Sequence, residues 1–284
     1  MPSLKALRKR ITTVRSTQQI TKAMKMVAAA RLRRAQEAAE RARPYAAKLA
    51  EMFAAVAAGA GAQTHPLLAR REERRVDLLV LTSDRGLCGA YNANLLRFAG
   101  GFLRQRSGVD VAVSVVGRKG LDYFRRRGTR LIAHRFGILT TPAPALAAEL
   151  AAEVAARFTA EETDAVYLVY SHFRSPISQV PSGVPLLPVD VPAGDAPPVD
   201  YIFEPARPRL LARLLPRYVE ARITQALLEA VASEHGARMT AMDNATRNAS
   251  EMIDLLTLSM NRARQASITK ELMEIISGAE ALKG

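Results

Sequence analysis

The residues best placed for chemistry follow a short apolar segment in the first third of the chain. Residues 76–82, VDLLVLT, are typical of a buried strand, and residues 83–89, SDRGLCG, come directly after it. A doubly wound fold binds its ligand at such a turn after a strand. The turn lacks the G-x-G-x-x-G spacing, and no G-x-x-x-x-G-K-S/T segment occurs in the chain. We therefore interpret it as a tight turn that lets the next helix pack on the sheet, with nucleotide binding as the alternative.

Other reaction chemistry has few candidate residues. Cys88 is the single cysteine, and a lone cysteine after a strand is a small buried residue more often than a nucleophile. Pairs of acidic residues at 72–73 and 161–162 lie in segments that read as solvated linkers. The histidines lack the spacing of metal ligands: His65, His134, His172 and His235. The sequence therefore predicts no catalytic residue, no metal site and no cofactor.

The elements that would position these residues include a long C-terminal helix. Residues 217–284 contain no proline, and their apolar residues recur at spacings of three and four. Pro216 precedes them, and proline is tolerated at the first position of a helix. A single helix of this length cannot bury its apolar stripe alone. The pattern therefore indicates a coiled-coil partner or, as the alternative, an ordinary helical bundle.

A second long helix is predicted at the N-terminus. Residues 3–58 contain no glycine, and Leu4, Leu7 and Ile11 begin an apolar stripe at helical spacing. Ser3 is a suitable N-cap, and we expect Pro44 to kink or restart the helix. The two terminal helices are similarly rich in alanine and weakly apolar. We expect them to pair in antiparallel fashion.

Between the two helices the hydrophobic period changes. Strands alternate with helices there, which predicts a Rossmann-like α/β insertion with a mostly parallel sheet. Nine prolines interrupt residues 174–208, where we expect an edge strand at 185–189 and otherwise an irregular link. The expected domains are a first coiled-coil helix at 1–58, the α/β domain at 75–205 and a second coiled-coil helix at 209–284. Within the α/β domain the expected strands are 76–82, 109–116, 130–136 and 164–170, and the expected helices are 92–106, 119–127 and 144–159.

Charge is unevenly distributed along the 284 residues. The net charge is +14, and residues 1–43 hold twelve basic and two acidic residues. Such a field favours an acidic partner, a nucleic acid or an anionic membrane surface. Aromatic residues are absent from the basic segment, and no helix-turn-helix, zinc-finger or RNP pattern occurs. A basic coiled-coil nucleic-acid-binding protein or a coiled-coil scaffold is therefore kept as the alternative function.

Three motifs carry a resemblance to a known family. They are TQQITKAMKMVAA at 17–29, SDRGLCGAYN at 83–92 and the run from ARM at 237–239 through DNAT at 243–246 to NRARQASITKEL at 261–272. In this order they resemble the gamma subunit of F-type rotary ATP synthases, and they span nearly the whole chain.

The resemblance implies a central-stalk rotor subunit that is not itself catalytic. Its terminal helices would form an antiparallel coiled coil inside a ring of three alpha and three beta subunits. Its α/β domain would lie near the epsilon subunit and the membrane c-ring. Proton flow through the c-ring would turn the subunit and drive the catalytic beta subunits through different nucleotide affinities.

The resemblance also implies contact residues. The positions that resemble beta-subunit contacts are Met24, Arg238 and Gln265. The positions that resemble the foot meeting the c-ring and epsilon are Tyr201, Phe203 and Glu204. Local alternatives remain open, since Arg238 could simply pair with Glu234 one turn earlier and Gln265 could simply face solvent.

Two departures from the family pattern refine this expectation. The chain lacks the two-cysteine insertion of chloroplast forms and shows no transit or signal peptide, so we expect a bacterial protein on the cytoplasmic side of the inner membrane. Its membrane association would be peripheral, through the c-ring. Gly236 lies within the predicted helix, where it would mark a kink or a close approach.

Overall fold

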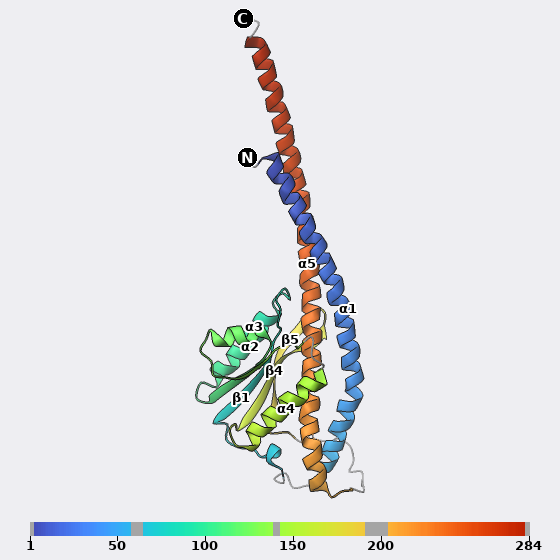
Figure 1. Cartoon of the computed structure of the whole chain (residues 1–284), viewed down its shortest axis with the longest axis vertical. Coiled ribbons are helices and arrows are strands. Elements are labelled where there is room, and N and C mark those ends of the chain that lie inside the picture. Colours follow the sequence, from blue (N-terminus) through green and yellow to red (C-terminus); the bar gives the residue numbers. More distant parts are fainter. Residues whose placement is uncertain (1–2, 58–64, 139–142, 191–203, 282–284) are drawn as a thin grey trace. The chain divides into compact units, whose positions relative to one another are not determined.

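The chain forms two compact units, each containing parts of two long helices. The computed structural model describes residues 3–57, 65–138, 143–190 and 204–281 (Figure 1). One unit comprises residues 1–27 and 239–284, and the other comprises residues 28–238. Helices α1 (Leu4–Ala57) and α5 (Arg207–Ala281) contribute to both units.

The larger unit is built on a five-stranded sheet with the strand order β3-β2-β1-β4-β5. The β1–β2, β1–β4 and β2–β3 pairs are parallel, and β4–β5 is antiparallel, which confirms the predicted mostly parallel α/β fold. The strands are β1 (Arg75–Leu81), β2 (Asp110–Val116), β3 (Leu131–Arg135), β4 (Ala165–Ser175) and β5 (Ser178–Leu187). The helices of this unit, besides parts of α1 and α5, are η1 (Pro66–Leu68), α2 (Tyr91–Gln105), α3 (Arg118–Arg125) and α4 (Ala143–Thr159).

Helices cover both faces of the sheet. Leu78 and Val80 of β1 pack in a core with α2 and α3, whereas Leu79 and Leu81 pack in a separate core with α4 and α5. Successive residues of a strand point to opposite faces, so a strand covered on both sides is apolar at nearly every position. This explains why residues 76–81 form an unbroken buried run. The exception in β1 is buried Asp77, which pairs with Arg157 at 2.7 Å.

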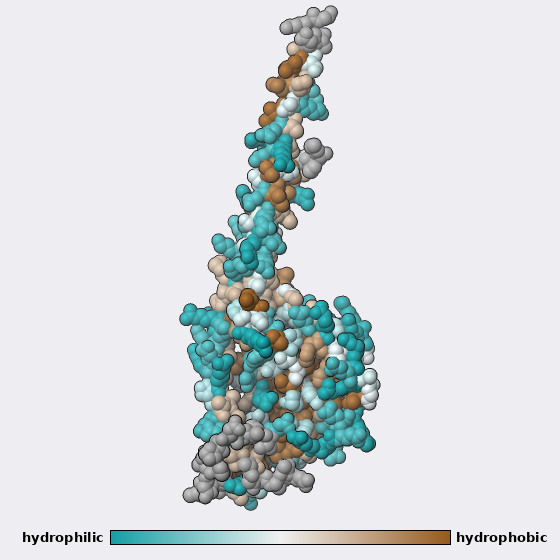
Figure 2. Space-filling model, turned by 180° about the vertical axis from the view of Figure 1, so that it is seen from behind, coloured by the Kyte–Doolittle hydropathy of each residue, from teal (hydrophilic) through white to brown (hydrophobic). Residues whose placement is uncertain are grey.

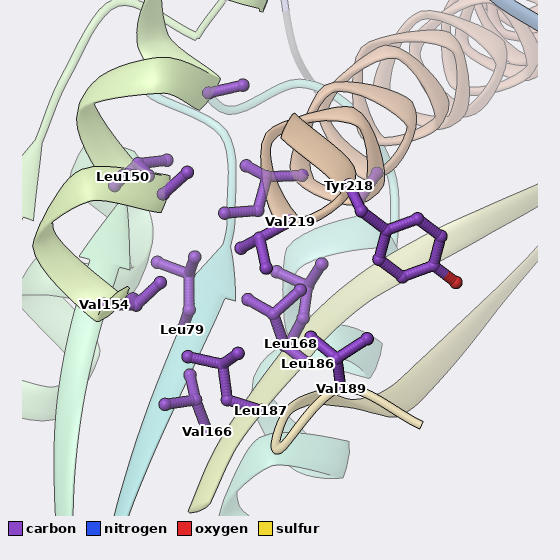
Figure 3. Close-up of a cluster of buried hydrophobic side chains, with 14 of the residues drawn as sticks. Leu79, Leu150, Val154, Val166, Leu168, Leu186, Leu187, Val189, Tyr218 and Val219 are labelled. Carbon is purple, nitrogen blue, oxygen red and sulfur yellow. The ribbon is translucent and has the colours of Figure 1, made fainter. Parts of the chain in front are cut away.

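Helix α5 lies directly on the sheet in the larger core. Figure 3 shows Val219 of α5 facing Leu168 of β4 and Leu186 of β5. Leu150 of α4 lies to the left of Val219 in this view. Tyr218 stacks on Phe53 of α1 with the ring centroids 4.8 Å apart. Residues 49–57 of α1 therefore pack in the same core as the sheet.

Both long helices continue through a proline. Helix α5 begins at Arg207 and includes Pro216, and α1 is not restarted at Pro44. A proline inside a helix removes one backbone hydrogen bond and costs about 3 kcal/mol. Buried residues follow soon after each proline, at Leu49 in α1 and Tyr218 in α5, and we attribute the continuity to their burial in the core.

The β5 strand is longer than the sequence indicated. The edge strand was expected at 185–189, and the structure has it at 178–187, antiparallel to a β4 that reaches residue 175. Pro181 and Pro185 lie within β5. Since β5 is an edge strand, only one of its sides must supply hydrogen bonds, and prolines are tolerated. Part of the expected irregular link is therefore a hairpin.

A close contact joins the ends of the first two strands. The Thr82 amide donates to the carbonyl of Val116 at 2.7 Å, and Gly120 N donates to Thr82 Oγ1 at 2.9 Å. Gly117, the residue after Val116, has a φ of 101°, and a Cβ at this position would lie 2.3 Å from the Thr82 carbonyl oxygen. Both the backbone conformation and the space therefore require glycine.

We expect Gly117→Ala to lower the free energy of unfolding by about 2 kcal/mol or more, because it adds a strained φ and a steric overlap. Gly108→Ala is the matched control, since a Cβ there meets nothing within 4 Å. Urea unfolding followed by circular dichroism measures both. Equal stability of the two variants would show that the contact carries no energetic weight.

Candidate functional site

Three segments of the α/β fold meet one stretch of α5, and we call this arrangement the α5 junction. It comprises residues 229–238 of α5, the loop and helix start at 83–92, the end of β4 at 171–173, and Pro176 at the hairpin turn. All of these residues belong to the larger unit. The junction thus links the sheet to the helix by contacts that are separate from the apolar core below it.

A buried ion pair lies at the centre of the junction. Arg238 Nη2 donates to Glu234 Oε1 at 2.6 Å and to the Gly86 carbonyl at 3.2 Å. The two side chains are 11% and 1% exposed. Burial raises the pKa of Glu234, while the charge and hydrogen bond of Arg238 oppose that rise. The pair thus ties α5 to the backbone of the 83–89 turn.

The 83–92 segment is held in place by its own polar side chains and by α5. Tyr91 donates a hydrogen bond from its hydroxyl to the Ala230 carbonyl at 3.3 Å. Asn92 Nδ2 donates to Ser83 Oγ at 2.7 Å and lies 3.1 Å from Cys88 Sγ. Cys88 is buried, and burial raises the pKa of its thiol. The structure therefore agrees with the interpretation of Cys88 as a small buried residue.

The strand end and the hairpin turn approach α5 closely. Ser233 Oγ donates to the Ser171 carbonyl at 2.8 Å. A Cβ on Gly236 would lie 3.3 Å from the ring of Phe173 and 3.3 Å from the backbone of Pro176. Of the two roles expected for Gly236, the structure shows the close approach.

His235 is a buried histidine in the same stretch, and it is only 4% exposed. Burial, together with the positive charges of Arg238 and Arg31, lowers its pKa to about 4. The imidazole is therefore neutral at pH 7, which avoids a third positive charge beside the ion pair.

The outer side of the 83–89 turn carries an unusual residue. Leu87 has a φ of 61° and is 65% exposed, so an apolar side chain is presented to solvent from a left-handed backbone. Such a conformation is uncommon for leucine and costs about 1–3 kcal/mol. Asp84 fixes the turn by accepting hydrogen bonds from the amides of Arg118 and Gly137.

The smaller unit contains an antiparallel pair of helices. Thr21 accepts a hydrogen bond from Thr246 at 2.8 Å, and Lys25 forms an ion pair with Asp243. Sequence number rises along one helix as it falls along the other, as predicted. The seam buries few hydrophobic side chains among the described residues: Leu7, Ile11, Met242 and Ala249. Hydrogen bonding and the charge of Lys25 hold the pKa of Asp243 below its ordinary value.

The C-terminal part of α5 extends beyond its partner helix. Thr21 of α1 lies beside Thr246 of α5. If this antiparallel register continues, the start of α1 lies beside about residue 263 of α5. Residues after that point lack a facing helix among the described residues, as the end of α5 in Figure 1 shows. Large hydrophobic residues there are 53–70% exposed, and Figure 2 shows them recurring along the helix. They are Ile268, Leu272, Met273, Ile275 and Ile276.

The residues proposed from the resemblance do not gather in one place. Arg238 belongs to the α5 junction, whereas Met24 and Gln265 belong to the other unit, where Met24 is half-buried and Gln265 is exposed. Glu204 is exposed, and Tyr201 and Phe203 lie outside the described residues. For Arg238 the local pairing with Glu234 is present. Contact of any of these residues with a partner stays a prediction.

Sequence reasoning missed most of the junction. Ser233 and Phe173 were not singled out, although the glycine at 236 within a helical pattern was the available signal. The described residues hold no group of histidine, cysteine or acidic side chains that could bind a metal ion. Among the described helices, none is both long enough and apolar enough to cross a membrane.

Comparisons with known proteins cover nearly the whole chain. The family model described as ATP synthase matches residues 3–282. ATP synthase gamma chains of Pelotomaculum thermopropionicum and Anaeromyxobacter sp. (strain K) are 52% and 51% identical, over all of this chain and all of each relative.

Solved structures give a consistent result. A chain from the central stalk and c-ring of the Tetrahymena thermophila mitochondrial ATP synthase is 28% identical with a TM-score of 0.61, covering 80% of this chain and 99% of that one. A chain of the Euglena gracilis mitochondrial ATP synthase has a TM-score of 0.71 at 21% identity, covering 98% of this chain and 94% of that one, which supports the fold.

We expect Arg238→Met to lower the free energy of unfolding by about 3 kcal/mol or more, because Glu234 would be left buried without its partner. The matched control is Arg247→Met, which removes an equally spaced pair with Asp243 in which Arg247 is 68% exposed. An exposed pair contributes about 1 kcal/mol at most. Urea unfolding compares the two variants, and similar losses would contradict a special role for the buried pair.

The lowered pKa of His235 makes the free energy of unfolding depend on pH. Its folded pKa lies below that of the unfolded chain, so between about pH 6.5 and 4 the unfolded state binds a proton that the folded state does not, and stability falls as pH falls. By pH 4 the wild type should lose about 3 kcal/mol relative to His235→Asn. Unfolding measured across this range in both proteins checks it, and parallel curves would exclude His235 as the cause.

Proposed function

The chain belongs to the ATP synthase family as a gamma chain, and from this premise we propose that it is the central-stalk rotor subunit of an F-type ATP synthase. In this role it couples proton flow through a membrane c-ring to conformational change in the catalytic beta subunits. The observation that carries the proposal is a long helix whose end bears exposed apolar residues and extends beyond its antiparallel partner.

A rotor must transmit torque without bending or unravelling. Long helices that continue through Pro44 and Pro216 support this role. The α5 junction supports it further, because force applied to the α/β domain reaches α5 through three hydrogen bonds to backbone carbonyls and the apolar core. The ion pair with Glu234 holds Arg238 in place for one of these bonds. A joint of buried, directional contacts resists slippage better than an apolar contact alone.

The exposed apolar end of α5 supports assembly with other subunits. Contiguous apolar surface on a helix marks an interaction site, since exposure of five large hydrophobic side chains to water is unfavourable. We infer that a ring of three alpha and three beta subunits encloses this end. The modest, threonine-containing seam at Thr21 and Thr246 fits a helix pair whose remaining surface also meets partners.

The energetic requirement for such a rotor is unequal contact. A rotor shifts a beta subunit between nucleotide affinities only by interacting differently with its two conformations. One chain inside a threefold ring presents a different face to each beta subunit. Met24, Arg238 and Gln265 are the residues we propose for these contacts, and Arg238 would have to act from its buried position beside Glu234.

The segment that contains Glu204 would meet the membrane part of the enzyme. We propose that Glu204, with Tyr201 and Phe203, forms the foot that contacts the c-ring and the epsilon subunit. Membrane association is then peripheral and indirect, on the cytoplasmic side of a bacterial inner membrane. The chain itself would be non-catalytic, with ATP bound and converted by the beta subunits.

The alternative functions gain no support from the comparisons. A basic nucleic-acid-binding protein or a free-standing scaffold would not be expected to match ATP synthase gamma chains at about half identity over their full length. The N-terminal basic segment is instead available to acidic surfaces of partner subunits, an electrostatic role that does not require sequence reading.

Reconstitution with alpha and beta subunits tests the proposal. The purified chain should hydrolyse no ATP, and the assembled complex should. Leu272→Asp combined with Ile276→Asp should weaken assembly about tenfold or more, because charged groups would be buried at the apolar end. Thr269→Asp with Ser277→Asp is the control, since it adds the same charges at exposed polar positions of the same helix.

Sizing chromatography and ATP turnover are the measurements. Turnover by the purified chain would contradict the non-catalytic role. Equal assembly of the two charged variants would show that the apolar end is not covered by the partner subunits.

A further inference from the structure

A second basic region, separate from the N-terminal segment, covers α2 and α3. Residues 91–130 contain nine basic residues and two acidic ones, and that excess equals half of the net charge of the whole chain. The arginines at the end of α2 and at or just after the end of α3 are exposed: Arg104, Arg125, Arg126 and Arg127. Positive charges this close together on two adjacent helices repel one another, so their presence needs a physical explanation.

These four arginines lack the carboxylate partners that arginines have elsewhere in the unit. No carboxylate of the described residues lies within 4 Å of their guanidinium groups, whereas Arg157 pairs with Asp77 at 2.7 Å and Arg135 pairs with Glu153 at 3.0 Å. The positive charges of these arginines are therefore not neutralised by carboxylates of the described residues. The binding capacity of the guanidinium groups is therefore available to something outside the chain.

Tyr123 lies close to two of these four arginines. The guanidinium of Arg127 lies over the Tyr123 ring, 3.7 Å from its centroid. The Tyr123 hydroxyl lies 3.0 Å from the point where a Cβ on Gly100 would be, and Arg104 Nη1 lies 3.6 Å from the same point. Gly100 therefore lets α3 approach α2, and it leaves the Tyr123 hydroxyl and Arg104 next to the same point of α2. Stacking restricts a guanidinium before any ligand arrives, which reduces the entropy lost on binding.

We propose that this α2–α3 face binds an acidic segment of another polypeptide through bidentate arginine–carboxylate pairs. The guanidinium fork matches a carboxylate in two parallel hydrogen bonds, and the charge of the face is complementary to such a segment. Arg126, the C-cap of α3, has helical backbone angles and follows Tyr123 by three residues, so it lies on the same side of the helix end as Tyr123. The proposal stands independently of the rotor function.

A membrane surface fits the face less well. Membrane-binding basic helices combine their charges with exposed aromatic or aliphatic side chains that insert among the lipids. Between residues 99 and 130 no large hydrophobic residue is exposed, and the Phe98 ring next to this range lies against Gly183 of β5. The observations therefore favour carboxylates of a protein over lipid headgroups.

The test uses the full chain and a fluorescent synthetic peptide rich in Glu and Asp. The variant Arg104→Gln/Arg126→Gln/Arg127→Gln should raise the Kd for this peptide about tenfold or more. The control is Arg8→Gln/Lys9→Gln/Arg10→Gln, which removes the same charge from three exposed residues of the N-terminal segment and should change the Kd less than threefold. A third variant, Arg104→Lys/Arg126→Lys/Arg127→Lys, keeps the charge without the fork and should weaken binding several-fold.

Three results would overturn the proposal. Equal weakening by the two Gln variants would indicate attraction to the net charge alone. Unchanged binding by the Lys variant would rule out bidentate pairing. The third result is that the Gln substitutions leave peptide binding unchanged but weaken binding to phosphatidylglycerol vesicles or to duplex DNA. That result would assign the face to another class of partner. Circular dichroism and melting temperatures of all variants confirm that each remains folded, which is expected because the substituted side chains are exposed.

Discussion

The structure depends on one constraint, which is that a helix of 75 residues must find different partners for its apolar face along its length. Residues such as Leu215 and Val219 are covered by the sheet and α4, and Met242 and Ala249 belong to the helix pair of the other unit. Hydrophobic burial contributes roughly 25 cal/mol per Å², so each covered stretch stabilises the adjoining one through the continuous helix. The last stretch is uncovered within the described chain, and this is why an assembly partner is required.

The α5 junction adds specificity to this arrangement. Apolar contacts tolerate small shifts in register, whereas Arg238, Glu234 and the Gly86 carbonyl fit together in one position only. A buried ion pair contributes little net stability compared with apolar residues of the same volume, but breaking it is strongly unfavourable. We therefore regard Arg238, held by Glu234 and bonded to the Gly86 carbonyl, as a device that fixes where the α/β domain is attached along α5. The neutral His235 beside it keeps that device free of additional charge.

Much of the architecture could be predicted from hydrophobic periodicity, and the failures have identifiable physical causes. Residues 76–82 and 109–116 read as strands because both faces of the sheet are covered, and the terminal helices read as partners because neither can bury its stripe alone. Helix α1 is not restarted at Pro44, and α5 begins before Pro216, because tertiary packing overrides local propensity. The length of β5 was hidden by prolines that an edge strand tolerates. The junction and the arginine face were missed because they depend on which segments meet in space. Gly236 and the run at 125–127 were the only local signs of them.

The burial of Cys88 has a practical consequence for experiments on this molecule. It is the single cysteine of the chain, it is 2% exposed, and its pKa is raised, so it reacts slowly with maleimides. A cysteine introduced at an exposed position would thus be modified selectively without first replacing the native one. Dyes, spin labels or surface tethers can be attached at a chosen point of an otherwise unaltered sequence, which makes the protein well suited to single-molecule spectroscopy.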